Sequence, residues 1–354
     1  MRTRTALSVL LVVGSVLAAC QNMPRSKNKR PETSGDTVWT IDWSDDGEFE
    51  SDDVYSSPET ADPLAGDVQL KKVTSLGQKA YLLGFDVRPA DSKILMSILE
   101  GVGERHSSPY ANIWTADVHG GLDRKTRVTE GPSLDLTPTY VPKEEAILFS
   151  SNRVGSTFSI FKKQLQGGGG VQLITSQNSQ DLWPQVDGET GLMLFTQVRE
   201  ASAGGGILWM RPVEGGAPTQ VGEGTEARWS ADGKMLLYSA ENPSTGQKHI
   251  WVRSVDGNQP EQVTEGNHND INPCWSPDGT KIVFASDRAT NAEGKHNYDI
   301  WLRNTDGKDE PHQLTANESV DDNPRWLDSE TILFRSNRGG EWNVWSLKIS
   351  QMGG

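Results

Sequence analysis

The chain has 354 residues, 34% of them hydrophobic and 12 of them Trp, with a formal net charge of −14. This length is enough for two ordinary domains or for one large all-β domain. The negative charge argues against a nucleic-acid partner, because phosphate binding needs clustered Lys and Arg. The charge is compatible with a cationic partner, although a soluble acidic surface is the simpler interpretation.

Residues 1–19 are predicted to be a lipoprotein signal peptide. Arg2 and Arg4 form a basic start, and the apolar run at 6–19 is shorter than the roughly 20 residues of a membrane span. The run ends in Leu-Ala-Ala-Cys, which resembles a bacterial lipobox, and this resemblance implies a lipid on the Cys20 thiol. The alternative is an ordinary signal peptide with a chance cysteine. Gln21, in place of Asp, favours the outer membrane, facing the periplasm, over the inner membrane.

Residues 20–66 are predicted to be a lipid-anchored acidic tether. The segment is polar, with frequent Glu, Asp, Ser and Pro. The stretch SDDGEFESDD at 44–53 resembles a calcium loop in composition, but it lacks the spaced ligands and closing Glu of an EF-hand. A solvated tether is therefore the favoured interpretation.

A cassette of roughly 46 residues then recurs along residues 67–354, and such a period is typical of stacked supersecondary units. Its clearest copy is INPCWSPDGTKIVFASDR, which starts at Ile271. An aliphatic–aromatic pair recurs six times, at 113–114, 160–161, 208–209, 250–251, 300–301 and 344–345. Short β-rich runs are separated by Asp-Gly turns, and the cassettes show no helical period. Units of this kind predict an all-β fold, a six-bladed β-propeller with four strands in each blade.

The last blade lacks a fourth strand in the sequence that follows its aromatic pair. After Trp345 only nine residues remain, whereas earlier blades place a short strand ending in Thr 13 to 15 residues after the aromatic residue. The segment VQLKKVTS at 68–75 resembles VQLITS at 171–176. We therefore expect this N-terminal strand to close the ring, which would remove the free edges of an open fan.

These cassettes resemble the TolB-like six-bladed β-propeller family, whose repeats carry a turn similar to Trp-Ser-Pro-Asp-Gly at 275–279. The resemblance covers about residues 67–350. It implies a monomeric, non-enzymatic propeller that binds another envelope protein, in a Tol-Pal-like or cell-wall-associated assembly. TolB itself has an α/β domain before its propeller, and this chain has the predicted anchor and tether there instead.

The sequence contains no G-x-S-x-G nucleophile motif and leaves no stretch for a separate hydrolase domain. Its six histidines lack metal-ligand spacing, so neither a metal nor a cofactor is expected. Cys274, in an apolar run, is predicted to be a small buried hydrophobe. Two alternatives to protein binding remain. One is a calcium-dependent hydrolase with ligands such as Asn272 and Asn323 on the axis; the other is a carbohydrate- or peptidoglycan-binding module.

Acidic residues stand just before the inner strands of five blades, and equivalent loops of a propeller lie on one face. We therefore expect them to surround the channel mouth, where a ring of carboxylates could receive a basic segment of a partner; these residues are Asp135, Asp181, Glu226, Asp270 and Asp322. The favoured interpretation is that each acid caps its own turn. Arginines at repeated positions are interpreted as local structural partners; they are Arg153, Arg288 and Arg338.

Overall fold

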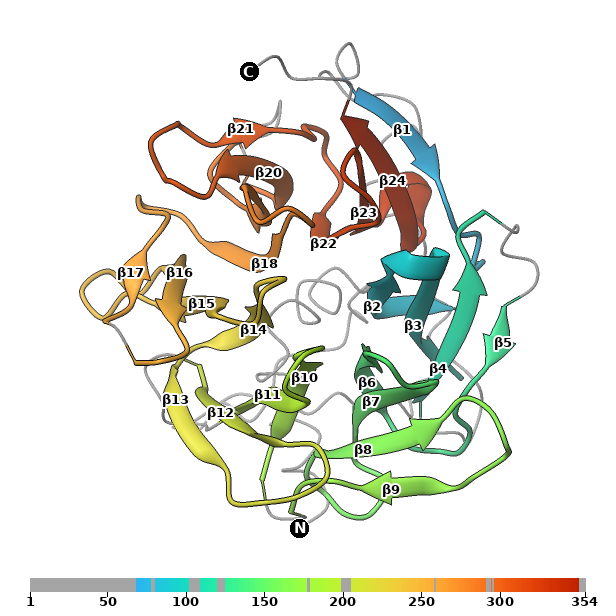
Figure 1. The fold of residues 1–354 in the computed structure, drawn as a ribbon. Coiled ribbons are helices and arrows are strands. Elements are labelled where there is room, and N and C mark those ends of the chain that lie inside the picture. The colour runs from blue at the N-terminus through green and yellow to red at the C-terminus, as the bar shows by residue number, and fades with distance from the viewer. Residues whose placement is uncertain are drawn as a thin grey trace, which may run out of the picture.

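The computed structural model describes residues 68–77, 80–101, 109–119, 125–176, 179–198, 205–257, 259–290, 294 and 296–349. These residues form six four-stranded antiparallel sheets arranged in a ring around an axis (Figure 1). The prediction of an all-β, six-bladed propeller is confirmed. In the described part of the chain, no helix has the length and apolar character needed to cross a membrane. The predicted signal peptide, Cys20 and the tether lie outside the described residues.

Each blade is numbered by its place in the chain, and its strands run from the inner strand at the axis to the outer strand at the rim. Blade 1 contains β2 (Tyr81–Arg88), β3 (Lys93–Glu100), β4 (Tyr110–Asp117) and β5 (Thr126–Arg127). Blade 2 contains β6 (Asp135–Val141), β7 (Ala146–Ser151), β8 (Ser159–Gln164) and β9 (Val171–Leu173). Blade 3 contains β10 (Asp181–Val186), β11 (Leu192–Gln197), β12 (Ile207–Pro212) and β13 (Thr219–Glu223).

The second half of the ring repeats this order. Blade 4 contains β14 (Thr225–Trp229), β15 (Met235–Glu241), β16 (Lys248–Ser254) and β17 (Glu261–Gln262). Blade 5 contains β18 (Asp270–Trp275), β19 (Lys281–Ser286), β20 (Asp299–Asn304) and β21 (His312–Gln313). Blade 6 contains β22 (Asp321–Trp326), β23 (Thr331–Ser336), β24 (Asn343–Ile349) and, from the start of the domain, β1 (Val68–Lys72). The described residues also contain two short 3-10 turns, η2 (Pro89–Asp91) and η4 (Arg338–Gly340).

The N-terminal strand closes the ring as the sequence predicts. β1 pairs with β24 in antiparallel register from Val68 opposite Ile349 to Lys72 opposite Trp345, and the two strands lie side by side in Figure 1. Just beyond β1, the Thr74 hydroxyl donates to Asn343 Oδ1 at 2.8 Å and accepts from the Val344 N–H at 2.8 Å. The outer edge of β24 is therefore covered from the other end of the chain.

The core lies between adjacent blades, where apolar faces of neighbouring sheets meet. Between blades 5 and 6, for example, Val283 and Ile300 pack in one cluster with Trp326 and Phe334. Cys274 joins this cluster but is only partly buried. Blades of this kind cannot bury their faces alone, so the stacked aromatic and aliphatic residues hold the ring together.

Candidate functional site

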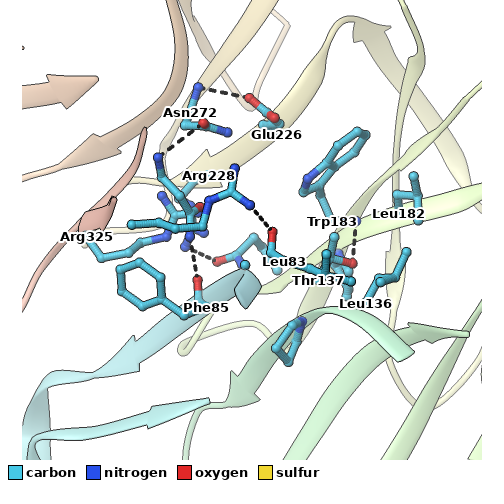
Figure 2. Close-up of a pocket in the computed structure, with 17 residues that line it drawn as sticks. Leu83, Phe85, Leu136, Thr137, Leu182, Trp183, Glu226, Arg228, Asn272 and Arg325 are labelled. Carbon is cyan, nitrogen blue, oxygen red and sulfur yellow. Dashed lines mark hydrogen bonds between the residues drawn. The ribbon is translucent and has the colours of Figure 1, made fainter. Parts of the chain in front are cut away.

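A pocket lies on the propeller axis and is lined by the inner strands of all six blades (Figure 2). Its wall combines aromatic, amide and charged side chains with a few aliphatic ones. The polar and aromatic lining residues are Phe85, Thr137, Trp183, Gln185, Glu226, Arg228, Asn272, Asn323, Arg325 and Arg335. Such a mixture can hold an extended polar chain by hydrogen bonds and stack against one of its side chains.

The inner strands carry a bulge at the same place in five blades. The central residue of each bulge has a left-handed backbone although none is glycine; these are Thr137, Trp183, Glu226, Asn272 and Asn323, with φ between 47° and 59°. The strand pairing shifts register at each of these points. A left-handed non-glycine residue costs of order 1 kcal/mol or more, so the surrounding structure must hold it there.

Hydrogen bonds between blades hold these bulge residues in place. Thr137 Oγ1 accepts the Trp183 N–H at 3.2 Å. Glu226 Oε2 accepts the Asn272 N–H at 2.9 Å, and Asn272 Oδ1 accepts the Asn323 N–H at 3.3 Å. The side chains of Thr137, Glu226 and Asn272 thus each bind the backbone of the next blade, which accounts for an oxygen-bearing residue at this position in those blades. In blade 4 the pairing register and the left-handed backbone both place Glu226 at this position.

Deeper along the inner strands, a charged network crosses the axis. Asp86 of blade 1 accepts from Thr139 Oγ1 at 2.9 Å and from Arg228 Nη1 at 3.0 Å. Arg228 belongs to blade 4, on the opposite side of the ring, and also donates to Gln185 Oε1 at 3.2 Å. Arg325 of blade 6 completes the network, with its Nε 3.5 Å from Asp86 Oδ1. Gln185, Arg228 and Arg325 of this network line the pocket, and we call the group of Asp86, Arg228 and Arg325 its floor.

The floor holds two guanidinium groups around one buried carboxylate. Burial lowers the pKa of Arg325 to about 10, and the neighbouring Arg228 acts in the same direction. Arg335, at the pocket wall, has its own carboxylate partner, Asp322, and donates to the carbonyls of Leu82 and Leu83. The arginines are therefore held by acidic and backbone oxygens of the protein itself.

The structure places the five predicted acidic residues in three different settings. Asp135, Asp181 and Asp270 open their inner strands and are at most 1% exposed, and Asp135 and Asp270 pair with Arg153 and Arg288 at 2.7 and 2.9 Å. Asp322 pairs with Arg335, so the residue of blade 6 that matches Asp135 is Asp321. Of the five, Glu226 alone lines the pocket.

Asp181 differs from the other strand-opening acids, because its hydrogen-bond partners are hydroxyls and an amide rather than a paired arginine. Ser179 Oγ donates to its Oδ2 at 2.7 Å. Burial raises the pKa of Asp181, and the hydrogen bonds from Thr175 and Ser179 oppose that shift. The interpretation of the three repeated arginines as local structural partners is confirmed, since each pairs with the acid that opens the inner strand of its own blade.

One cluster that the sequence did not indicate lies at the seam between blades 4 and 5. His249 of β16 and His268, which precedes β18, both face the carboxylate of Asp270. His249 Nδ1 lies 3.5 Å and His268 Nε2 lies 3.4 Å from Asp270 Oδ2. Although burial favours the neutral acid, the two imidazoles and Arg288 hold the pKa of Asp270 below its usual range. Sequence spacing could not reveal this cluster, because the two histidines belong to different blades.

No protein-family model matches the sequence, and no curated protein matches it. Solved structures do match. A putative TolB from Agrobacterium tumefaciens is 14% identical, covers 80% of this chain and 98% of its own length, and has a TM-score of 0.55. TolB from Acinetobacter baumannii is 16% identical, with coverage of 77% and 64% and a TM-score of 0.51. The fold is that of the TolB propeller.

The same propeller also occurs in a protein with a different name. Oligogalacturonate lyase from Vibrio parahaemolyticus is 12% identical, covers 80% of this chain and 94% of its own length, and has a TM-score of 0.50. At these identities the likeness shows the fold alone, and proteins named TolB and a protein named as a lyase share that fold. Function must therefore be argued from the site.

Proposed function

We propose that this chain is a non-enzymatic envelope protein that binds an extended segment of another envelope protein in its axial pocket, in a Tol-Pal-like or cell-wall-associated assembly. The observation that carries the proposal is the composition of the pocket wall. Trp183 offers an aromatic face, while Glu226, Asn272 and Asn323 offer oxygen and amide groups around it. The floor formed by Asp86, Arg228 and Arg325 would stop the bound segment partway along the propeller axis.

The predicted lipid on Cys20 supports the same proposal. Two or three acyl chains would form a lasting anchor, where one chain alone binds a membrane only reversibly. The tether at 20–66 would then let the propeller search a layer beside the outer membrane on the periplasmic side. A partner embedded in or attached to the envelope would be met in that layer.

The proposal also narrows the earlier prediction of an acidic docking surface. A basic segment that enters the pocket would meet Glu226, which already accepts a hydrogen bond from the Asn272 N–H. Asp135, Asp270 and Asp322 each pair with an arginine through at least one carboxylate oxygen, and all three are buried, as is Asp181. Direct contact with a partner is therefore proposed for Glu226, and the other four acids would act by keeping the inner strands in place.

Site-specific crosslinking in cells tests the proposal. A photoreactive amino acid in place of Trp183 is expected to capture one envelope protein, whereas the same amino acid in place of Gln172, exposed on β9 at the rim, is not. Glu226→Gln should weaken capture by about 10-fold, the value of one charge-assisted hydrogen bond. Cys20→Ser should move the protein from the membrane to the soluble fraction and reduce capture further. Equal capture from Trp183 and Gln172 would refute the pocket as the docking site.

A further inference from the structure

We propose that His249, His268 and Asp270 form a binding site for a transition-metal ion of the Zn²⁺ class, which links blades 4 and 5. His249 lies on β16 of blade 4, and Asp270 opens β18 of blade 5. His268 stands two residues before β18, in the segment that joins the two blades. An ion held by all three would tie neighbouring sheets together at their seam.

The distances fit a metal better than they fit hydrogen bonds. Asp270 Oδ2 lies 3.5 Å from His249 Nδ1 and 3.4 Å from His268 Nε2, and all three atoms lie within 4.8 Å of one another. Zinc bonds to imidazole nitrogen and carboxylate oxygen are about 2.0–2.1 Å long in a tetrahedral site, which places ligand atoms about 3.3–3.4 Å apart. The separation between Asp270 and His268 has this value already, and the 3.5 Å between Asp270 and His249 is slightly longer.

The same three atoms are buried, and the contacts between them fall short of good hydrogen-bond geometry. His249 is 1% exposed and Asp270 is fully buried. Buried polar atoms nearly always have a partner, because an unpaired one loses its hydration without compensation. Two imidazole nitrogens and a carboxylate oxygen that converge on one point supply the ligand types that zinc prefers, and an ion there would satisfy all three.

The surroundings of Asp135 in blade 2 show that the two histidines of the cluster are not a feature of every repeat. There, Asp135 Oδ1 accepts from Ser133 and Ser151 at 3.2 and 2.6 Å, and Arg153 donates to both carboxylate oxygens. Hydroxyls and an arginine thus satisfy this acid completely. In blade 5, His268 takes the place of Ser133, two residues before the acid, and the Asp270 oxygen that faces it lacks a hydrogen bond.

Neighbouring residues hold the ligands in position. Arg288 binds the other oxygen of Asp270 at 2.9 Å and stacks on Phe284 and Trp301, which orients Oδ2 toward the histidines. Gly266 has φ +128°, and a Cβ there would lie 2.3 Å from Cε1 of His268. The glycine therefore leaves room for the imidazole in its present orientation. The His268 side chain is 16% exposed, so a water molecule could reach a fourth coordination position.

None of the three ligands lines the axial pocket, so the metal site is independent of the proposed docking function. The test uses the propeller stripped of metal with a chelator and then titrated with Zn²⁺ by calorimetry, and with Co²⁺ by visible absorption. We expect one ion per chain, the absorption bands of tetrahedral cobalt, and a rise in Tm on zinc addition.

His268→Ala and His249→Ala each remove a metal ligand. The affinity for zinc should therefore fall by more than the roughly 10–100-fold that is typical when only a residue hydrogen-bonded to a ligand is lost. His312→Ala, which removes an exposed histidine from β21, should leave affinity, spectrum and Tm shift unchanged. Because His249 is buried, circular dichroism of each metal-free variant must confirm folding. If His249→Ala unfolds, the result for His268→Ala decides, because the His268 side chain is partly exposed. Absence of one-to-one binding by the unmodified protein, or binding that His268→Ala leaves intact, would overturn the proposal.

Discussion

Buried pairs of a carboxylate and a guanidinium occupy repeated positions in blades 2, 5 and 6. In blade 6, Arg338 pairs with Asp321, and both side chains are at most 1% exposed. The guanidinium also stacks over the rings of Phe334 and Trp345 in its own blade. The pairing compensates the charge of Arg338, and the stacking covers the faces of the two rings. The arginine that recurs at this position therefore stabilises its own blade, and its contacts do not indicate a role in ligand binding.

This arrangement predicts a large cost when one partner is removed. Arg338→Ala would leave Asp321 buried without its counter-charge, and we expect a loss of about 3–5 kcal/mol in the free energy of unfolding. Chemical denaturation measures it. Lys308→Ala removes one member of an exposed pair with Asp306, whose side chains are 80% and 52% exposed, and should cost less than about 1 kcal/mol. A similar loss in both variants would contradict the structural role of Arg338.

At the scale of the element, the Asp-Gly turns define where inner strands end. In blade 5, Asp278 Oδ1 accepts from Ser276 Oγ at 2.6 Å and from the Thr280 N–H at 3.0 Å, while Gly279 has φ +72°. Blade 4 repeats the turn at Ser230 and Asp232. The motif that identifies the repeat is therefore a hydrogen-bonded turn, which explains its recurrence without any role in binding.

The turn also predicts a dependence of stability on pH. The hydrogen bonds from Ser276 and Thr280 lower the pKa of Asp278 to about 2. A carboxyl group with a depressed pKa stabilises the fold above its ordinary pKa of about 4, and this contribution disappears as the pH falls through about 2. Asp278→Asn should therefore destabilise the protein at pH 7, by less than about 1 kcal/mol because water screens an exposed group.

Denaturation of both proteins at several pH values checks this expectation. The difference between the original protein and Asp278→Asn should be constant above about pH 5 and should shrink between about pH 4 and 2. Glu261→Gln, on the exposed outer strand β17, provides a matched loss of one carboxylate away from the turn. A difference that stays constant down to pH 2 would show that the charge of Asp278 does not stabilise the turn.

The sequence predicted elements well wherever a repeat gave several copies to compare. The blade count and the closing strand at 68–75 were both confirmed, because a period and a missing strand are visible in one dimension. Blade 1 is the most divergent copy. Its register puts Val87 opposite Ile94, as Tyr140 stands opposite Ile147, so a valine occupies the position that is aromatic in blades 2, 4, 5 and 6.

The pocket and the metal-site candidate could not be predicted in the same way. Arg228 and Asp86 are 142 residues apart and meet because blades 1 and 4 face each other across the axis. His249 and His268 meet because the seam between two blades brings a middle strand of one beside the start of the next. Contacts of this kind depend on how the sheets are arranged in space, and they leave no pattern within a single repeat.

At the scale of the whole molecule, the charged floor of the pocket joins opposite sides of the ring. Most interactions in a propeller link adjacent blades. The pairing of β1 with β24 closes the ring of blades. The bond between Arg228 and Asp86 instead spans the diameter, and Thr139 and Arg325 attach two further blades to the same carboxylate. The floor should therefore resist any splaying of the blades that would widen the axial pocket.

A double-mutant cycle on Asp86 and Arg228 tests this coupling. Asp86→Ala should cost about 3–5 kcal/mol, because Arg228 and the buried Arg325 both lose their shared counter-charge. Arg228→Ala should cost less, since Arg325 still compensates Asp86. The interaction energy between the two sites should lie at about 1–3 kcal/mol, within the range of residues that share a buried network.

The matched cycle uses Lys143 and Glu189, which pair at 3.3 Å between blades 2 and 3 with side chains 67% and 76% exposed. Its interaction energy should stay below about 1 kcal/mol, because water screens the pair. If the cycle on Asp86 and Arg228 gave an equally small value, the bond across the axis would not hold the ring together. A large value would mean that a ligand entering the pocket meets a rigid floor, since displacing Arg228 would cost much of that energy.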